Sequence, residues 1–146
     1  MKLLLMSDGA SRGNPGHAGA GAVLRDETGT VVGEVCRYLG VTTNNQAEYQ
    51  ALLLGIAEAS RLGGTTLEIA LDSELLVRQL NGQYRVRAPH LLPLYESAKC
   101  QLAGFAAVRV RHIPRELNTH ADLLSNRAID ERFLRRVDPP APAGGA

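Results

Sequence analysis

The sequence is poor in the residues that build thiolate metal centres, disulfide frameworks and membrane spans. Its 146 residues include two cysteines and no tryptophan. Cys36 and Cys100 form no CxxC pair and are not bracketed by histidines, so we expect reduced, packed side chains. The apolar run LLLM after Lys2 is too short for a signal peptide or a membrane segment. These absences predict a cytoplasmic protein with no membrane partner, in which any metal site is built from oxygen ligands.

An excess of charge of either sign is also absent. The net charge is +1, so the charge total does not by itself indicate a nucleic-acid partner. The arginines are grouped instead, around NGQYRVR and towards the end of the chain: Arg78, Arg85 and Arg87, then Arg109, Arg111, Arg115 and Arg127. Solvated surfaces are the usual place for arginine, so this grouping leaves the question of a nucleic-acid partner open.

The length predicts one domain with a sizeable core, over residues 1–135. No internal repeat and no second domain is evident. The segment that begins at Asp138, DPPAPAGGA, contains only small residues and prolines after the aspartate and cannot bury enough apolar area to order itself. We therefore expect residues 136–146 to form a flexible tail, and the protein to be a monomer.

Hydrophobic periods and turn signals predict an α/β fold with the element order βββαβαβα. This order implies a five-stranded mixed sheet with helices on both faces, because a helix before the fourth strand favours a parallel crossover. The glycine-rich segment DGASRGNPG follows the first predicted strand, and its Asn-Pro-Gly is a turn signal. The predicted strands are 2–7, 20–26, 30–39, 65–71 and 105–112, and the predicted helices are 45–62, 73–80, 90–103 and 118–134.

Four carboxylates stand where one predicted element gives way to the next: Asp8, Glu48, Asp72 and Asp122. In open α/β sheets, ligands collect at strand ends, so these points can gather at one end of the sheet. Four crowded acids would repel one another and resist ionising unless a cation offset their charge. Carboxylates and water are the ligands that Mg²⁺ or Mn²⁺ prefers.

Each acid also has an ordinary structural interpretation. Glu48 fits a capping box with Asn45, and Asp122 fits one with Thr119. Asp72 or its neighbour Ser73 can cap a helix, and Asp8 can begin a turn. The spacing alone does not show that the four acids converge in space.

Four segments together resemble the signature segments of type 1 ribonuclease H. They occur in the family's order along residues 2–130: DGASRGNPG, NNQAEY, DSELLVRQLNGQYRVR and HIPRELNTHAD. The predicted element order also matches the ribonuclease H-like fold. The resemblance implies an endonuclease that hydrolyses the RNA strand of an RNA–DNA hybrid and leaves 5′-phosphate and 3′-hydroxyl ends. It further implies that Asp8, Glu48, Asp72 and Asp122 hold two Mg²⁺ or Mn²⁺ ions.

The resemblance assigns roles to further residues. His112, ten residues before Asp122, matches a mobile histidine that assists proton transfer or product release in the family, although it can also be a plain strand-end residue. Family positions near the nucleic acid, where side chains bond phosphate and minor-groove edges, are matched by Ser11, Asn14, Thr43, Asn44 and Asn45. Turn and cap chemistry is the alternative role for these five residues.

The chain departs from the family pattern at three places. Glu74 stands where many members carry glutamine, and a carboxylate can accept but not donate a hydrogen bond to a base edge. A tryptophan-rich basic insertion is missing, as in the short bacterial and archaeal forms. Hybrid binding would then depend on Tyr84, Arg85 and Arg87, or would be weak. His17 occupies a position where proline is common.

Two other functions are compatible with the same residues. A non-catalytic nucleic-acid-binding module of this fold would be expected to have lost an acid, and none is lost. A related nuclease could act on double-stranded RNA, or on DNA as a resolvase does. Double-stranded RNA is the alternative that the short form favours.

Overall fold

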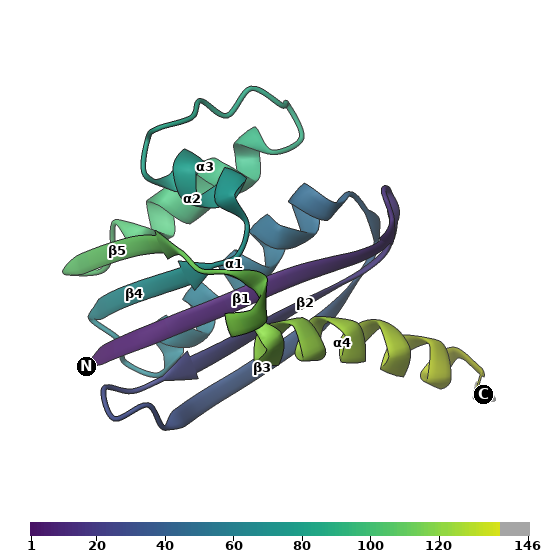
Figure 1. Cartoon of the computed structure of the whole chain (residues 1–146), viewed down its shortest axis with the longest axis horizontal. Coiled ribbons are helices and arrows are strands. Elements are labelled where there is room, and N and C mark those ends of the chain that lie inside the picture. The colour runs from purple at the N-terminus through teal and green to yellow at the C-terminus, as the bar shows by residue number, and fades with distance from the viewer. Residues whose placement is uncertain (138–146) are drawn as a thin grey trace, which may run out of the picture.

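A computed structural model describes residues 1–137, with side chains described as far as Arg132, and forms a single sheet flanked by helices (Figure 1). The elements are β1 (Lys2–Gly13), β2 (Gly16–Arg25), β3 (Val31–Thr42), α1 (Asn44–Arg61), β4 (Thr66–Leu71), α2 (Glu74–Leu80), α3 (Leu92–Leu102), β5 (Ala107–His112), a 3₁₀ turn (Arg115–Leu117) and α4 (Thr119–Val137). The predicted order βββαβαβα is confirmed. The helix α4 includes residues 136 and 137, and the remainder of the predicted tail, 138–146, lies outside the described residues.

The sheet has the strand order β3-β2-β1-β4-β5, which places β1 at its centre. β2 pairs antiparallel with both β1 and β3, whereas β4 runs parallel to both β1 and β5. Figure 1 shows α4 in front of the sheet and α1 behind it. The predicted mixed sheet with helices on both faces is therefore confirmed, and β1 is covered on both sides.

The glycine-rich segment forms a regular hairpin. The turn predicted at its Asn-Pro-Gly is confirmed, but the predicted strands 2–7 and 20–26 began or ended too far from that turn. β1 continues through Gly13, and β2 begins at Gly16 on the far side of a cis Asn14–Pro15 bond. A Cβ at Gly9 would lie 2.2 Å from the carbonyl carbon of Ala47 in α1, and one at Gly19 would lie 2.1 Å from the carbonyl oxygen of Ser125 in α4. The glycines therefore let helices approach both faces of the hairpin closely.

The main core lies between the sheet and α1. It contains Leu3 and Leu5 of β1, Leu52 and Ile56 of α1, and Ile69 of β4, all almost completely buried. A smaller buried cluster on the α4 side joins Val23 to Ala121 and Leu124. These apolar contacts hold α1 and α4 against the central strands and so fix the positions from which their acids project.

The expectation that both cysteines are packed was wrong. Cys36 and Cys100 are free and exposed. Cys36 lies on β3, an edge strand with many exposed side chains, and α3 buries only Ala98 and Leu102. Composition alone favours a buried cysteine, whereas the position of the element in the fold decides exposure. Among the described helices, none is both long enough and apolar enough to cross a bilayer.

Candidate active site

Two of the acids are brought level by the register of adjacent parallel strands. The paired residues of β1 and β4 end at Met6 and Ala70. Asp8 and Asp72 each lie two residues beyond that last pair. Because the strands run in the same direction, both carboxylates leave the sheet at the same edge. Asp8 lies inside β1 and pairs with Gly21, so it does not begin a turn.

The third acid reaches the same point from α1. Glu48 is in the N-terminal part of this helix, and its Oε1 accepts a hydrogen bond of 2.8 Å from the backbone N–H of Gly9. The capping box of α1 is formed by Thr43 and Gln46, so the predicted box of Asn45 with Glu48 was wrong. Since another pair caps the helix, the Glu48 carboxylate is available to the pocket.

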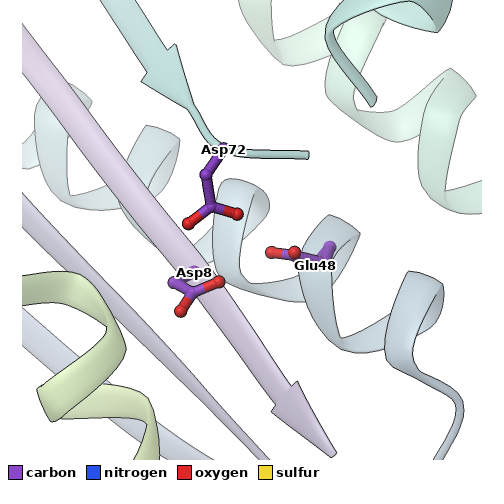
Figure 2. A group of neighbouring side chains, drawn as sticks. All are labelled: Asp8, Glu48 and Asp72. Carbon is purple, nitrogen blue, oxygen red and sulfur yellow. The ribbon is translucent and has the colours of Figure 1, made fainter. Parts of the chain in front are cut away.

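The three carboxylates meet in one place. Ligand oxygens of Asp8, Glu48 and Asp72 all lie within 4.8 Å of one another, and Figure 2 shows the three side chains turned toward a common point. They line a pocket of about 240 Å³. Asp122 is outside this group of three but lines the same pocket, together with Gly9, Ala10, Ser11, Asn44 and Arg115.

The electrostatics of the pocket favour a bound cation. Asp8 is 7% exposed, and burial raises the pKa of its carboxyl, with further increases from the charges of Glu48 and Asp72 and from contact with Asp122. Burial also raises the pKa of Glu48, against the lowering effect of the Gly9 N–H. Each acid would release its proton more readily beside a positive charge. A compact set of carboxylate oxygens suits a hard divalent ion, so the residues fit Mg²⁺ or Mn²⁺.

Asn118, the residue just before α4, hydrogen-bonds to Asp72 and was not predicted as a site residue. Its amide nitrogen donates to Asp72 Oδ2 at 3.0 Å and to the carbonyl oxygen of Ser7 at 2.9 Å. The side chain is 1% exposed, so these bonds are sheltered from water. The sequence signal, an asparagine before a helix, is the same as that of an ordinary cap, and therefore did not distinguish this role.

Arg115 is a second residue whose position was not foreseen. It begins the 3₁₀ turn before α4 and lines the acidic pocket. Its charge favours the ionised form of Glu48, although burial has the larger effect on the pKa of that group. The pocket thus contains a positively charged side chain of its own beside the acids.

The remaining predicted catalytic residues lie around this pocket. Ser73 caps α2 by accepting from the Leu76 N–H, so Asp72 is not needed as a cap. Asp122 lies within α4, where Nδ2 of Asn126 donates to its Oδ1 at 3.3 Å. His112 ends β5, and its Nε2 lies 3.3 Å from the carbonyl oxygen of Asp72, outside the residues that line the pocket.

The predicted substrate residues divide into two groups. Ser11 and Asn44 line the pocket, and the Asn44 N–H donates to Oδ1 of Asn14 at 3.0 Å, which ties the hairpin turn to α1. Thr43 and Asn45 lie at the start of α1, where Thr43 is the cap. Glu74 is not part of the lining. It begins α2 and forms an ion pair of 2.8 Å with Arg78.

Comparisons with known proteins agree with this geometry. A family model described as reverse transcriptase-like matches residues 6–128. The crystal structure of RNase H1 from the archaeon Halobacterium salinarum is 39% identical and superposes with a TM-score of 0.88, covering 90% of this chain and 99% of that one. The chain belongs to the type 1 ribonuclease H family. LC11-RNase H1, solved in complex with RNA/DNA hybrid, is 38% identical with a TM-score of 0.86, over 90% of this chain and 99% of the other.

The family relationship also extends to longer proteins. A bifunctional protein of Mycobacterium tuberculosis is 42% identical over 131 residues, which are 89% of this chain and 36% of that protein. This ribonuclease H chain therefore spans about a third of the length of its mycobacterial relative. It also spans 62% of the ribonuclease HI of Halobacterium salinarum, with 41% identity over 124 residues.

Proposed function

We propose that this chain is a metal-dependent endoribonuclease that hydrolyses the RNA strand of RNA–DNA hybrids and leaves 5′-phosphate and 3′-hydroxyl ends. The convergence of Asp8, Glu48 and Asp72 within 4.8 Å carries the proposal. Such a group of acids is unfavourable without a cation and is the ligand set for phosphodiester hydrolysis by divalent metals. Membership of the type 1 ribonuclease H family supports the same chemistry.

The residues of the pocket have different proposed roles. Asp8, Glu48, Asp72 and Asp122 would hold the cations, and the Gly9 N–H and Asn118 amide orient two of these carboxylates. When bound, two Mg²⁺ or Mn²⁺ ions supply the positive charge that activates the attacking water and stabilises the leaving 3′-oxygen. Arg115 adds a fixed positive charge toward the scissile phosphate.

His112 is proposed to assist proton transfer or product release. The ring lies at the border of the site, because it contacts the backbone of Asp72 and is exposed. A histidine imidazole can both accept and donate a proton, which suits this role. The proposal requires the exposed His112 side chain to move into the pocket.

Substrate binding is proposed for the strip that runs from the hairpin turn to the start of α1. Its residues offer amide and hydroxyl groups that suit the minor groove, where 2′-hydroxyls distinguish RNA from DNA: Ser11, Asn14, Thr43, Asn44 and Asn45. The bond between Asn14 and Asn44 makes this strip one surface. Glu74 is proposed to contact the substrate at the margin, as an acceptor only.

A cleavage assay on a labelled RNA–DNA hybrid tests the proposal. We expect shortened RNA with Mg²⁺ or Mn²⁺ and none with EDTA, and products that carry 5′-phosphate ends. Asp72→Asn should abolish cleavage and leave the fold intact by circular dichroism. Full-length RNA with both metals supplied would contradict the proposed activity, and an active Asp72→Asn variant would remove Asp72 from the site.

Double-stranded RNA is proposed as a second substrate. The connection between α2 and α3 is short, and the exposed Tyr84 stacks with Arg78 rather than forming part of a large basic insertion. Recognition would then depend on the strip of residues proposed to bind the minor groove. Double-stranded RNA also presents a minor groove lined with 2′-hydroxyls. We further propose that the protein is a monomer, because the acidic pocket is formed within one chain, and that it acts in the cytoplasm. Parallel assays with hybrid, double-stranded RNA and DNA, and light scattering, test these points.

A further inference from the structure

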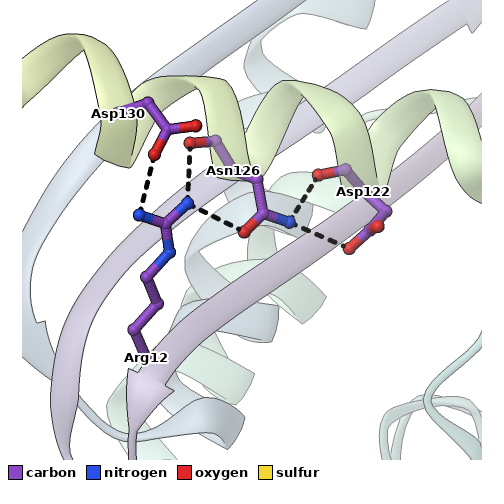
Figure 3. A network of polar contacts seen from close by, with 4 residues as sticks. All are labelled: Arg12, Asp122, Asn126 and Asp130. Carbon is purple, nitrogen blue, oxygen red and sulfur yellow. Dashed lines mark hydrogen bonds and ion pairs between the residues drawn. The ribbon is translucent and has the colours of Figure 1, made fainter.

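A line of polar contacts connects the β1–β2 hairpin to the fourth acid. Asp122, Asn126 and Asp130 follow one another at intervals of four residues on one face of α4, and Arg12 at the end of β1 reaches across to them (Figure 3). Its Nη1 lies 2.8 Å from Asp130 Oδ1. Its Nη2 lies 3.3 Å from Asn126 Oδ1 and 3.4 Å from the Asn126 carbonyl oxygen.

The donors and acceptors in these contacts can be assigned in only one way. The guanidinium group of Arg12 can only donate, so the oxygen of the Asn126 amide faces Arg12. The amide nitrogen then faces Asp122, where it donates to Oδ1 at 3.3 Å and to the backbone carbonyl oxygen at 3.1 Å. If the amide were reversed, its oxygen would meet the Asp122 carboxylate, which is unfavourable. Arg12 therefore selects the amide orientation that Asp122 requires.

Asp122 needs such an external constraint more than the other three acids. Asp8 and Asp72 leave the central strands, and Glu48 is held by the Gly9 N–H. Asp122 is on an exposed part of α4 and is not among the three acids whose oxygens lie together. Its bond with Asn126 engages Oδ1 and leaves Oδ2 without that donor. This arrangement determines which carboxylate oxygen can turn toward a cation.

We propose that Arg12 is a positioning residue that acts through Asn126 to orient the Asp122 carboxylate for metal binding. The inference rests on the proposed function, since it concerns the same metal site. Arg12 does not line the pocket, and both terminal nitrogens of its guanidinium group are engaged by α4. Its effect on the site must therefore pass through Asn126.

Titration calorimetry with Mn²⁺ alone, on the full chain without nucleic acid, tests the proposal. We expect Asn126→Ala and Arg12→Met each to weaken Mn²⁺ binding by about tenfold, because partners of metal ligands usually have effects of that size or more. The double variant should bind no more weakly than Asn126→Ala. Unchanged affinity in Arg12→Met, or losses that multiply in the double variant, would overturn the proposal.

Arg127→Met is the matched control. Like Arg12, Arg127 is an arginine paired with an acid of α4, but its Nε donates to Glu131, at 2.7 Å, and not to the Asn126 amide that faces Asp122. We expect its Mn²⁺ affinity to equal that of the wild type. Loss of a positive charge should by itself favour a cation. A tenfold loss in this control would therefore show that removing an arginine near α4 disturbs the site non-specifically, and would also overturn the proposal.

A second measurement needs no metal. In the metal-free protein, Arg12→Met should shift the side-chain amide resonances of Asn126 in a ¹⁵N correlation spectrum. In a separate cleavage assay with Mn²⁺ supplied, KM for hybrid should remain unchanged while kcat falls. Unshifted amide resonances, or a rise in KM alone, would contradict positioning through Asn126. Failure of the proposed function is distinguishable, because it would appear in the wild type as absence of Mn²⁺ binding and cleavage.

Discussion

The backbone N–H of Gly9 donates to the carboxylate of Glu48 across 2.8 Å, which joins the central strand to α1 inside the acidic pocket. The contact is possible because Gly9 has no side chain where the two backbones approach. The same glycine therefore serves packing and chemistry. It brings α1 close enough for Glu48 to reach Asp8 and then holds the Glu48 carboxylate in place.

Gly9→Ala should destabilise the protein by about 3 kcal/mol, at the upper end of penalties for overpacking. The new Cβ would lie 2.2 Å from the carbonyl carbon of Ala47, and no rotamer change can relieve a contact with backbone. Urea denaturation followed by circular dichroism measures the change. Gly104→Ala is the control, because its Cβ would meet only the Gln101 carbonyl oxygen, at 3.4 Å. Equal stability of the two variants would contradict the close approach at Gly9.

Asp8→Asn should stabilise the metal-free protein at pH 8 by roughly 0.5–2 kcal/mol, since active sites often retain unfavourable charges. Burial raises the pKa of the folded Asp8 carboxyl above its ordinary value of 3.8. The folded state then binds the proton more tightly than the unfolded state. Its contribution to stability is therefore complete below pH 3.8 and decreases as the pH rises toward the folded pKa.

Thermal unfolding in EDTA at pH 5 and pH 8 measures this effect. The difference between Asp8→Asn and the wild type should be larger at pH 8. Mg²⁺ should raise the melting temperature of the wild type at pH 8 more than that of the variant, because a ligand stabilises the state that binds it. A variant that is less stable than the wild type at pH 8 without metal would contradict the interpretation of Asp8.

The arrangement of the acids could be foreseen where it depends on local pattern. Asp8 and Asp72 follow apolar strand segments, and the helix between the strands predicts a parallel crossover, so their common edge follows from topology. The extension of both hairpin strands up to the predicted turn could not be foreseen in the same way. Glycine has a low strand propensity. Gly19 is needed because the backbone of Ser125, more than a hundred residues away in the sequence, lies where a Cβ would be.

The details of the pocket depend on such distant contacts as well. Asn118 holds Ser7 and Asp72 across the fold, yet in sequence it is one more asparagine before a helix. Arg115 could be assigned only to a group of arginines, because no period places a 3₁₀ turn against the pocket. The capping box is formed by Thr43 and Gln46 rather than by Asn45 and Glu48. Local sequence pattern did not resolve this shift of two residues.

Asn118→Ala should lower stability by about 1–3 kcal/mol, because it leaves the buried Ser7 carbonyl oxygen without this donor. It should also weaken Mn²⁺ binding by about tenfold or more, since the amide holds Asp72. Denaturation and calorimetry measure the two effects separately. Asn81→Ala is the control, as its amide donates to the Val110 carbonyl oxygen at an exposed position and Asn81 is not part of the lining of the acidic pocket. Wild-type metal affinity in Asn118→Ala would remove Asn118 from the support of the site.

Glu74→Gln should lower KM for an RNA–DNA hybrid about twofold to tenfold, the range of one added neutral hydrogen bond. The amide supplies a donor that the carboxylate lacks and removes a negative charge near the phosphates. Stability should hardly change, because the ion pair with Arg78 is exposed and such pairs contribute little. Steady-state kinetics on the hybrid measure KM. Glu58→Gln is the control, because it breaks an ion pair with Arg61 in the C-terminal part of α1. An unchanged KM in Glu74→Gln would mean that position 74 lies outside the substrate-binding surface.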